Sequence, residues 1–333
     1  MGRLVAMEQV VGPGHGRTIR IIRRSSDEWL RMKFSMMLIA GVALALLVVL
    51  PLVLCIAGLK RAPAARLPKR RWDIRLSLAS MLLYVLAFNL TFFIQEFFLA
   101  LPKALTPGLS VTLYHNNQIW EGTSPLVALF QGTGALATCI SALVCALLLA
   151  FADVRSATWR LFLLWMVVSG AFMALPQVVV GALTAGSDLG MAMGYFHLGV
   201  KVKTALALAA LVAMPVIGLL LARAWPVFDG ADGSTGARDR ARSVFSTAAL
   251  PAIVALPAIV GYRVPRSWLE VLFLPVVVTW FSTIWIQAGA SWVDSRHHSR
   301  VGDHRPSPTL PFLAALALLL IFQLVLRPGL RLG

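Results

Sequence analysis

The stretch LSLASMLLYVLAFNLTFFIQEFFLALP, residues 76–102, decides the fold class. Its 27 residues contain one charged side chain, Glu96, and are otherwise almost entirely apolar. A helix that crosses a membrane needs about 20 consecutive, mostly apolar residues. The stretch is therefore predicted to be a membrane-spanning helix.

Seven further stretches have the same character, at residues 34–58, 125–152, 160–184, 204–223, 245–262, 267–288 and 309–327. The whole chain has 333 residues, of which 59% are apolar and 13% charged, with a mean hydropathy of +0.80. Soluble proteins carry about 25% charged residues, so a water-soluble enzyme, a disordered chain and a coiled coil are excluded. We expect an all-α bundle of about eight transmembrane helices, integral to a bacterial-type inner membrane, with the lipid bilayer as its first partner.

The charged residues are strongly unbalanced, with 30 Lys and Arg against 14 Asp and Glu. Nearly all the basic residues fall in loops and ends, where Lys and Arg flank membrane helices and meet anionic lipid, so no nucleic-acid partner is expected. For eight spans they divide 14 to 16 between the two sides, which sets no orientation.

The chain divides into three parts by composition. Residues 1–33 are basic and compatible with an amphipathic helix on the membrane surface, although a start at Met32 or Met36 is an alternative. Residues 34–327 form a single polytopic membrane domain, and residues 328–333 form a short basic tail.

Polar side chains interrupt the span that decides the fold. It contains Asn89, Gln95 and Glu96, and the seven-residue spacing of Asn89 and Glu96 puts them on one helix face. An ionisable group inside a membrane is costly, which makes Glu96 a candidate for proton handling or metal binding. The alternative is a structural role, in which a neighbouring residue pairs with the buried Glu96 carboxylate or the Glu96 side chain extends to the membrane surface at the helix end.

The next segment predicts a short β hairpin between two membrane helices. Pro102, Pro107 and Gly108 stop the helix, residues 110–114 have β character, and His115, Asn116 and Asn117 form a polar turn before residues 118–120 resume the strand pattern. Non-helical backbone at membrane depth survives only when it is buried in protein or lines a wet cavity. We therefore expect the hairpin to be membrane-embedded.

Two more segments place polar residues at helix starts. The third span opens with Gln131, Gly132, Thr133 and Gly134, and small residues of this kind let helices approach closely. Asp188 lies in a glycine-rich break between apolar segments, a pattern typical of substrate and ion sites. The alternative for Asp188 is an exterior turn in which it caps the next helix.

The order of these features resembles the membrane core of the site-2 protease group of intramembrane zinc metalloproteases. That group carries a His-Glu-x-x-His motif, an embedded β hairpin, a Gly-rich, Asn-bearing helix start and a helix break whose Asp is the last zinc ligand. The matching segments here are Gln95-Glu96-Phe97-Phe98-Leu99, Thr112 to Trp120, Gln131-Gly132-Thr133-Gly134 and Asp188-Leu189-Gly190, all within residues 80–200. Both motif histidines are replaced, by Gln95 and Leu99.

The missing histidines argue against zinc proteolysis, because a catalytic zinc site needs three protein ligands and Glu96 with Asp188 leaves one place empty. Zinc is not the expected cofactor, and the chain is not expected to be an enzyme. The leading hypothesis is a non-proteolytic core that binds a peptide, a lipid, another ligand or a partner helix in an intramembrane polar cavity. The candidate lining residues are Asn89, Gln95, Glu96, His115, Asn116, Asn117, Gln131 and Asp188.

Three alternatives stay open. The chain could be a secondary transporter that uses Glu96 and Asp188 as proton or cation sites. It could be an active intramembrane metalloprotease with atypical zinc ligands, in which His115 or His197 completes the set. It could also be a structural subunit that packs against other membrane subunits. A weaker metal candidate is the loop with His297, His298 and His304, whose simpler interpretation is a solvated loop.

Overall fold

The protein is described by a computed structural model that covers residues 15–61, 72–225, 228, 237–265, 268–292 and 306–332. Within these residues, eight helices are long and apolar enough to cross a membrane. They run over Trp29–Gly58, Ile74–Ala104, Val127–Phe151, Ala157–Leu183, Val200–Ala224, Ala237–Arg263, Val271–Ala290 and Thr309–Leu326. The prediction of a multi-pass, mostly helical chain is therefore confirmed.

The helices are divided as follows: α1 (His15–Leu44), α2 (Leu50–Arg61), α3 (Ile74–Ala104), α4 (Val127–Phe130), α5 (Thr133–Phe151), α6 (Ala157–Leu183), α7 (Asp188–Tyr195), α8 (Val200–Ala224), α9 (Ala237–Val244), α10 (Leu250–Arg263), α11 (Leu274–Ala290) and α12 (Thr309–Leu320). The strands are β1 (Leu109–Tyr114), β2 (Asn117–Gly122) and β3 (Leu330–Leu332). The basic residues from His15 onward belong to α1, which continues without a break into the first span.

Several of the long helices contain a short π-helical turn placed just before a proline. In the described residues these turns cover Ala45–Val49, Phe245–Ala249, Leu269–Phe273 and Ile321–Leu326, and the prolines are Pro51, Pro251, Pro275 and Pro328. Proline lacks an N–H, and its ring clashes with the carbonyl four residues earlier. A widened turn at that point accommodates the ring, so Pro51, Pro251 and Pro275 lie within continuing helices.

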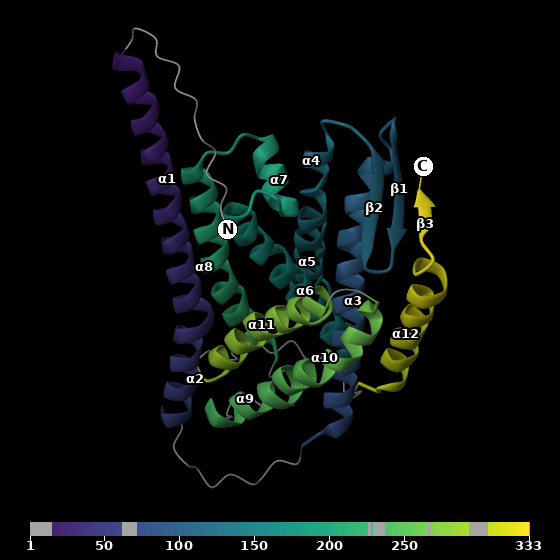
Figure 1. Cartoon of the computed structure of the whole chain (residues 1–333). Helices are drawn as coiled ribbons and strands as arrows, with labels where there is room; N and C mark the ends of the chain where they lie inside the picture. Colours follow the sequence, from purple (N-terminus) through teal and green to yellow (C-terminus); the bar gives the residue numbers. More distant parts are fainter. Residues whose placement is uncertain are drawn as a thin grey trace.

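The helices form a bundle around α6, which is the most buried of the eight candidate spans. It packs against α3, α5 and α8, while α11 packs against α8 and α10 against α3. In Figure 1, α1, α3, α5, α6 and α8 run roughly alongside one another, and α10 and α11 cross them. The β hairpin and α12 lie together at the edge of the bundle next to α3.

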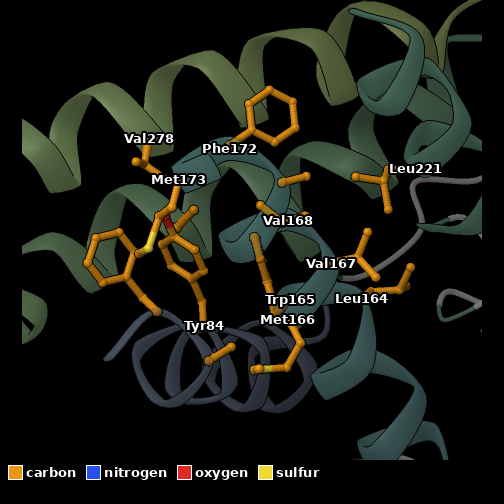
Figure 2. Close-up of a cluster of buried hydrophobic side chains, with 14 of the residues drawn as sticks. Tyr84, Leu164, Trp165, Met166, Val167, Val168, Phe172, Met173, Leu221 and Val278 are labelled. Carbon is orange, nitrogen blue, oxygen red and sulfur yellow. The ribbon is translucent and has the colours of Figure 1, made fainter. Parts of the chain in front are cut away.

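The core is apolar, as Figure 2 shows around Tyr84 and Trp165, and some of its polar groups are hydrogen-bonded. Both side chains are fully buried. The hydroxyls of Tyr84 and Thr279 are hydrogen-bonded at 2.8 Å, and the indole N–H of Trp165 donates to Ser80 Oγ at 3.0 Å. These bonds fix the orientation of Tyr84 and Trp165, whereas Trp225 Nε1 and Ser169 Oγ are buried without a hydrogen-bond partner among the described residues.

A small sheet lies along the C-terminal half of α3. β1 and β2 pair antiparallel from Leu109 opposite Gly122 to Tyr114 opposite Asn117, and His115 and Asn116 connect them. Val111 and Leu113 of β1 are buried against Ala100, among Phe93 and Phe97. The hairpin therefore folds back beside the helix that precedes it, as Figure 1 shows.

The third strand comes from the other end of the described chain. β3 pairs antiparallel with the free edge of β1, which gives the strand order β2-β1-β3. Gly329, at φ +94°, leads into this strand, and a Cβ there would come within 2.7 Å of the Tyr114 ring. Part of the segment expected to be only a basic tail thus completes the sheet.

Candidate functional site

A cavity of about 570 Å³ lies where α3, the β hairpin, the end of α4, α7 and the α10–α11 connection meet. Its charged lining residues are Glu96, Asp188 and Arg263, and its amides are Asn116, Asn117, Gln118 and Gln131. The remaining lining residues are Phe92, Leu99, Trp120, Gly186, Met191, Phe273 and Leu274. The cavity therefore combines opposite charges, amides and apolar surface.

The structure brings five of the sequence candidates to this one cavity: Glu96, Asn116, Asn117, Gln131 and Asp188. They come from α3, the hairpin turn, the residue after α4 and the first residue of α7. Glu96 and Asp188, which are far apart in the sequence, therefore line a shared space.

The other three candidates pack elsewhere. Asn89 donates from Nδ2 to the carbonyl of Val85 at 2.8 Å, one turn back on its own helix. Gln95 accepts at Oε1 from Nε2 of Gln177 at 2.9 Å, which links α3 to α6. His115 is buried next to Phe322, with 6.4 Å between the ring centroids. None of these side chains lines the cavity, because each faces a neighbouring helix or its own backbone.

Lys103 is a charged residue of the site that the sequence did not indicate. It is fully buried near the end of α3. In the sequence it lies beside Pro102 at the end of a predicted span, where a Lys is normally a solvent-exposed loop residue. Its Nζ donates to Gln131 Oε1 at 3.2 Å and lies 4.3 Å from the centroid of the Trp120 ring. It also attracts Asp188 and Glu96 electrostatically, so this ammonium partly balances both carboxylates.

Arg263 is the second charged residue that sequence reasoning placed in a loop. It is the last residue of α10 and is buried, with its guanidinium carbon 3.9 Å from the centroid of the Phe92 ring. Its carbonyl accepts a 2.6 Å hydrogen bond from Asn116 Nδ2. The hairpin turn is thereby joined to the end of α10.

The geometry around Asp188 corrects its interpretation as a helix cap. Ser187 is the N-cap of α7, because its Oγ accepts from the N–H of Gly190 at 3.2 Å, and Asp188 is the first helical residue. Burial raises the pKa of the Asp188 carboxyl, and the nearby Lys103 offsets part of that rise. A Cβ on Gly190 would lie 2.0 Å from the carbonyl oxygen of Thr184, so this glycine serves a tight turn.

The cavity does not fit a zinc ion. In the part of the chain that the structure describes, no three His, Cys, Asp or Glu residues come close enough to hold a metal. The two carboxylates of the cavity also have the Lys103 ammonium near them, which opposes a divalent cation. His297, His298 and His304 lie outside the described residues.

Comparisons of the chain with family models, with curated proteins and with solved structures gave no match in any of the three. Two acids, one arginine and several amides around the cavity, with Lys103 bound to the lining Gln131, can hold a polar molecule by directed hydrogen bonds, while the apolar residues hold an attached hydrocarbon part.

Proposed function

We propose that this multi-pass membrane protein binds a small ligand in the cavity between α3, the hairpin and α7, on a site-2-protease-like core that performs no zinc proteolysis. The observation that carries this proposal is the convergence of Glu96 and Asp188 on one cavity with Arg263. Burying charged groups is expensive, so a cavity that gathers three of them is typical of a functional site in a membrane protein.

The size and lining of the cavity support the same proposal. Ligand sites commonly enclose about 300–1,000 Å³ and combine apolar walls with a few placed polar groups. The cavity has about 570 Å³. The order of helix, hairpin, helix start and Asp-bearing break supports the resemblance to the site-2 protease core, and the replacement of both motif histidines supports the loss of proteolysis.

Native mass spectrometry of the purified protein tests ligand binding. We expect a bound small molecule in the wild type and its loss in Met191→Trp, because the larger side chain fills part of the cavity. Met37→Trp is the matched control, since Met37 is highly exposed on α1 and remote from the cavity. The proposal fails if the wild type carries no ligand or if Met191→Trp retains it fully.

A transport function is the second candidate, and the charge arrangement favours it. The buried ammonium of Lys103 attracts the carboxylates of Asp188 and Glu96. Protons or cations can exchange between such neighbouring ionisable groups in a membrane protein. Proteoliposomes with an imposed pH gradient test this function. We expect ion flux that Glu96→Gln abolishes, and a wild type that carries no flux would exclude transport.

A further inference from the structure

We propose that the ligand is a membrane lipid with a zwitterionic headgroup that carries a primary ammonium, and that it enters sideways past Phe273. This inference rests on the ligand-binding function proposed above and names the class of ligand.

The cavity lies toward one end of the candidate spans that enclose it. Glu96 lies eight residues before the end of α3 at Ala104, which corresponds to about 12 Å along the helix. Phe273 is the third residue of the candidate span Val271–Ala290. Because α3 has 31 residues, or about 46 Å, a centred helix extends about 8 Å beyond each face of a hydrocarbon core of about 30 Å. Glu96 then lies just inside the boundary between the hydrocarbon region and the headgroups, and Phe273 lies near the same boundary.

The mouth of the cavity presents apolar side chains to the outside. Phe273 lines the cavity and is 60% exposed, and its neighbour Leu272 is exposed beside it. Trp268, just before the span, is 76% exposed, and Trp commonly lies at the membrane interface. On a spanning helix, exposed apolar side chains face lipid, so a lipid tail can remain in the bilayer while its headgroup enters.

The polar groups of the cavity favour a primary ammonium. Glu96 and Asp188 supply carboxylates, and Gln118, which lines the cavity, has a buried Oε1 that finds no hydrogen-bond partner among the described residues. An –NH3⁺ group has three N–H donors for such acceptors. A trimethylated ammonium has none, so the site should select ethanolamine over choline headgroups.

The basic groups complete the match to a zwitterion. The Arg263 guanidinium lies at the cavity, and Arg is well suited to bind the phosphate of a headgroup. Lys103 lies near both Glu96 and Asp188, and Arg263 lines the same cavity, so two positive charges equal the two negative ones in number. A ligand without net charge leaves this balance unchanged, whereas a purely anionic or cationic headgroup would add an unbalanced buried charge.

The test is a lipid competition on the full-length protein in detergent. The protein is incubated with equal amounts of dioleoylphosphatidylethanolamine and dioleoylphosphatidylcholine, and the retained lipid is measured by native mass spectrometry. We expect retention of phosphatidylethanolamine on the order of tenfold over phosphatidylcholine, because the charged hydrogen bonds are lost with choline. Glu96→Gln and Asp188→Asn should each reduce this preference.

Glu121→Gln is the matched control, since Glu121 is an exposed acid on the same hairpin and does not line the cavity. Equal retention of the two lipids by the wild type would overturn the inference. This comparison uses the wild-type protein alone and does not depend on the folding of any variant. Displacement of the lipid by an equal concentration of glycerophosphoethanolamine would also overturn it in favour of a soluble amine. If another small molecule is retained instead, this inference fails while the proposed ligand binding survives.

Discussion

Lys103 is a buried cation whose neighbours are two carboxylates and an aromatic ring. Lys103→Met would leave Asp188 and Glu96 without this compensation. Removing one partner of a buried charge pair costs about 3–5 kcal/mol. We therefore expect a clearly lower thermal unfolding temperature in detergent, and partial recovery when Asp188→Asn is added.

The control for Lys103→Met is Lys201→Met, because Lys201 is exposed on α8 and exposed charges contribute little to stability. Equal unfolding temperatures for the wild type and Lys103→Met would contradict the assigned charge balance.

The Asp188 carboxyl should make stability depend on pH. Burial raises its pKa above the ordinary value of 3.8, with partial offset by Lys103. The folded state therefore holds this proton more tightly than the unfolded state. The resulting contribution to stability is fully present below pH 3.8 and is lost as the pH rises through the folded-state pKa.

Unfolding temperatures measured against pH check this expectation. The wild type should lose stability more steeply than Asp188→Asn as the pH rises from 3.8 toward neutrality. Asp153→Asn should follow the wild-type profile, since Asp153 is exposed beside Arg155. Parallel curves for the wild type and Asp188→Asn would show that Asp188 is not the group responsible.

The sequence reveals some charged residues of the site and hides others. Glu96 and Asp188 stand out because each interrupts an apolar or glycine-rich stretch. Lys103 and Arg263 lie at helix ends, where Lys and Arg are usually solvent-facing anchors. Only the packing of the hairpin and of α10 against α3 buries them, and neither contact leaves a pattern in the local sequence.

At the scale of elements, the close approach of α5 and α6 depends on Gly170. A Cβ there would lie 2.7 Å from the carbonyl oxygen of Thr138 and 2.8 Å from the Cβ of Ala142. Overpacking a tight contact costs about 1–3 kcal/mol. We expect Gly170→Ala to lower the thermal unfolding temperature by pushing the two helices apart.

Gly261→Ala is the matched control for this helix contact. Gly261 is also helical, in α10, but a Cβ there would meet nothing within 4 Å. Alanine is the better helix former by up to about 1 kcal/mol, so this variant should be neutral or slightly stabilised. Similar losses in both variants would mean that the contact with α5 is not decisive.

Elements were predictable to different degrees. The long helices follow from apolar runs of sufficient length, and each predicted span overlaps an observed one. The third strand could not be predicted, because Leu330, Arg331 and Leu332 are too few to show a strand period. Their pairing with β1 is a tertiary contact.

At the scale of the whole molecule, the eight candidate spans of the described chain place His15 and Leu332 on the same side of a membrane. Lys103 and Arg263 are buried, so they no longer count as loop charges. Of the 14 basic residues on the side of residues 1–33, 12 then remain, against 16 on the other side. The positive-inside tendency predicts that the side of the Asp153–Arg155 turn is cytoplasmic.

Single cysteines in a variant that lacks Cys55, Cys139 and Cys145 test this orientation. We expect a membrane-impermeant thiol reagent to label Leu105→Cys in intact cells, and to label Asp153→Cys only after the cells are opened, because each site is exposed on its own side. The reverse labelling would show the opposite orientation, and labelling of both sites in intact cells would contradict the span count.

The pairing of β3 with β1 also has a consequence for biosynthesis. Roughly two-thirds of the chain separates these strands, and the hydrogen bond from Asn116 to the Arg263 carbonyl spans 147 residues. A nascent chain that has packed its hairpin on α3 must therefore wait for the helices between β2 and β3 before β3 can cover the free edge of β1. The three-stranded sheet is therefore assembled only after the helices between β2 and β3 have been made.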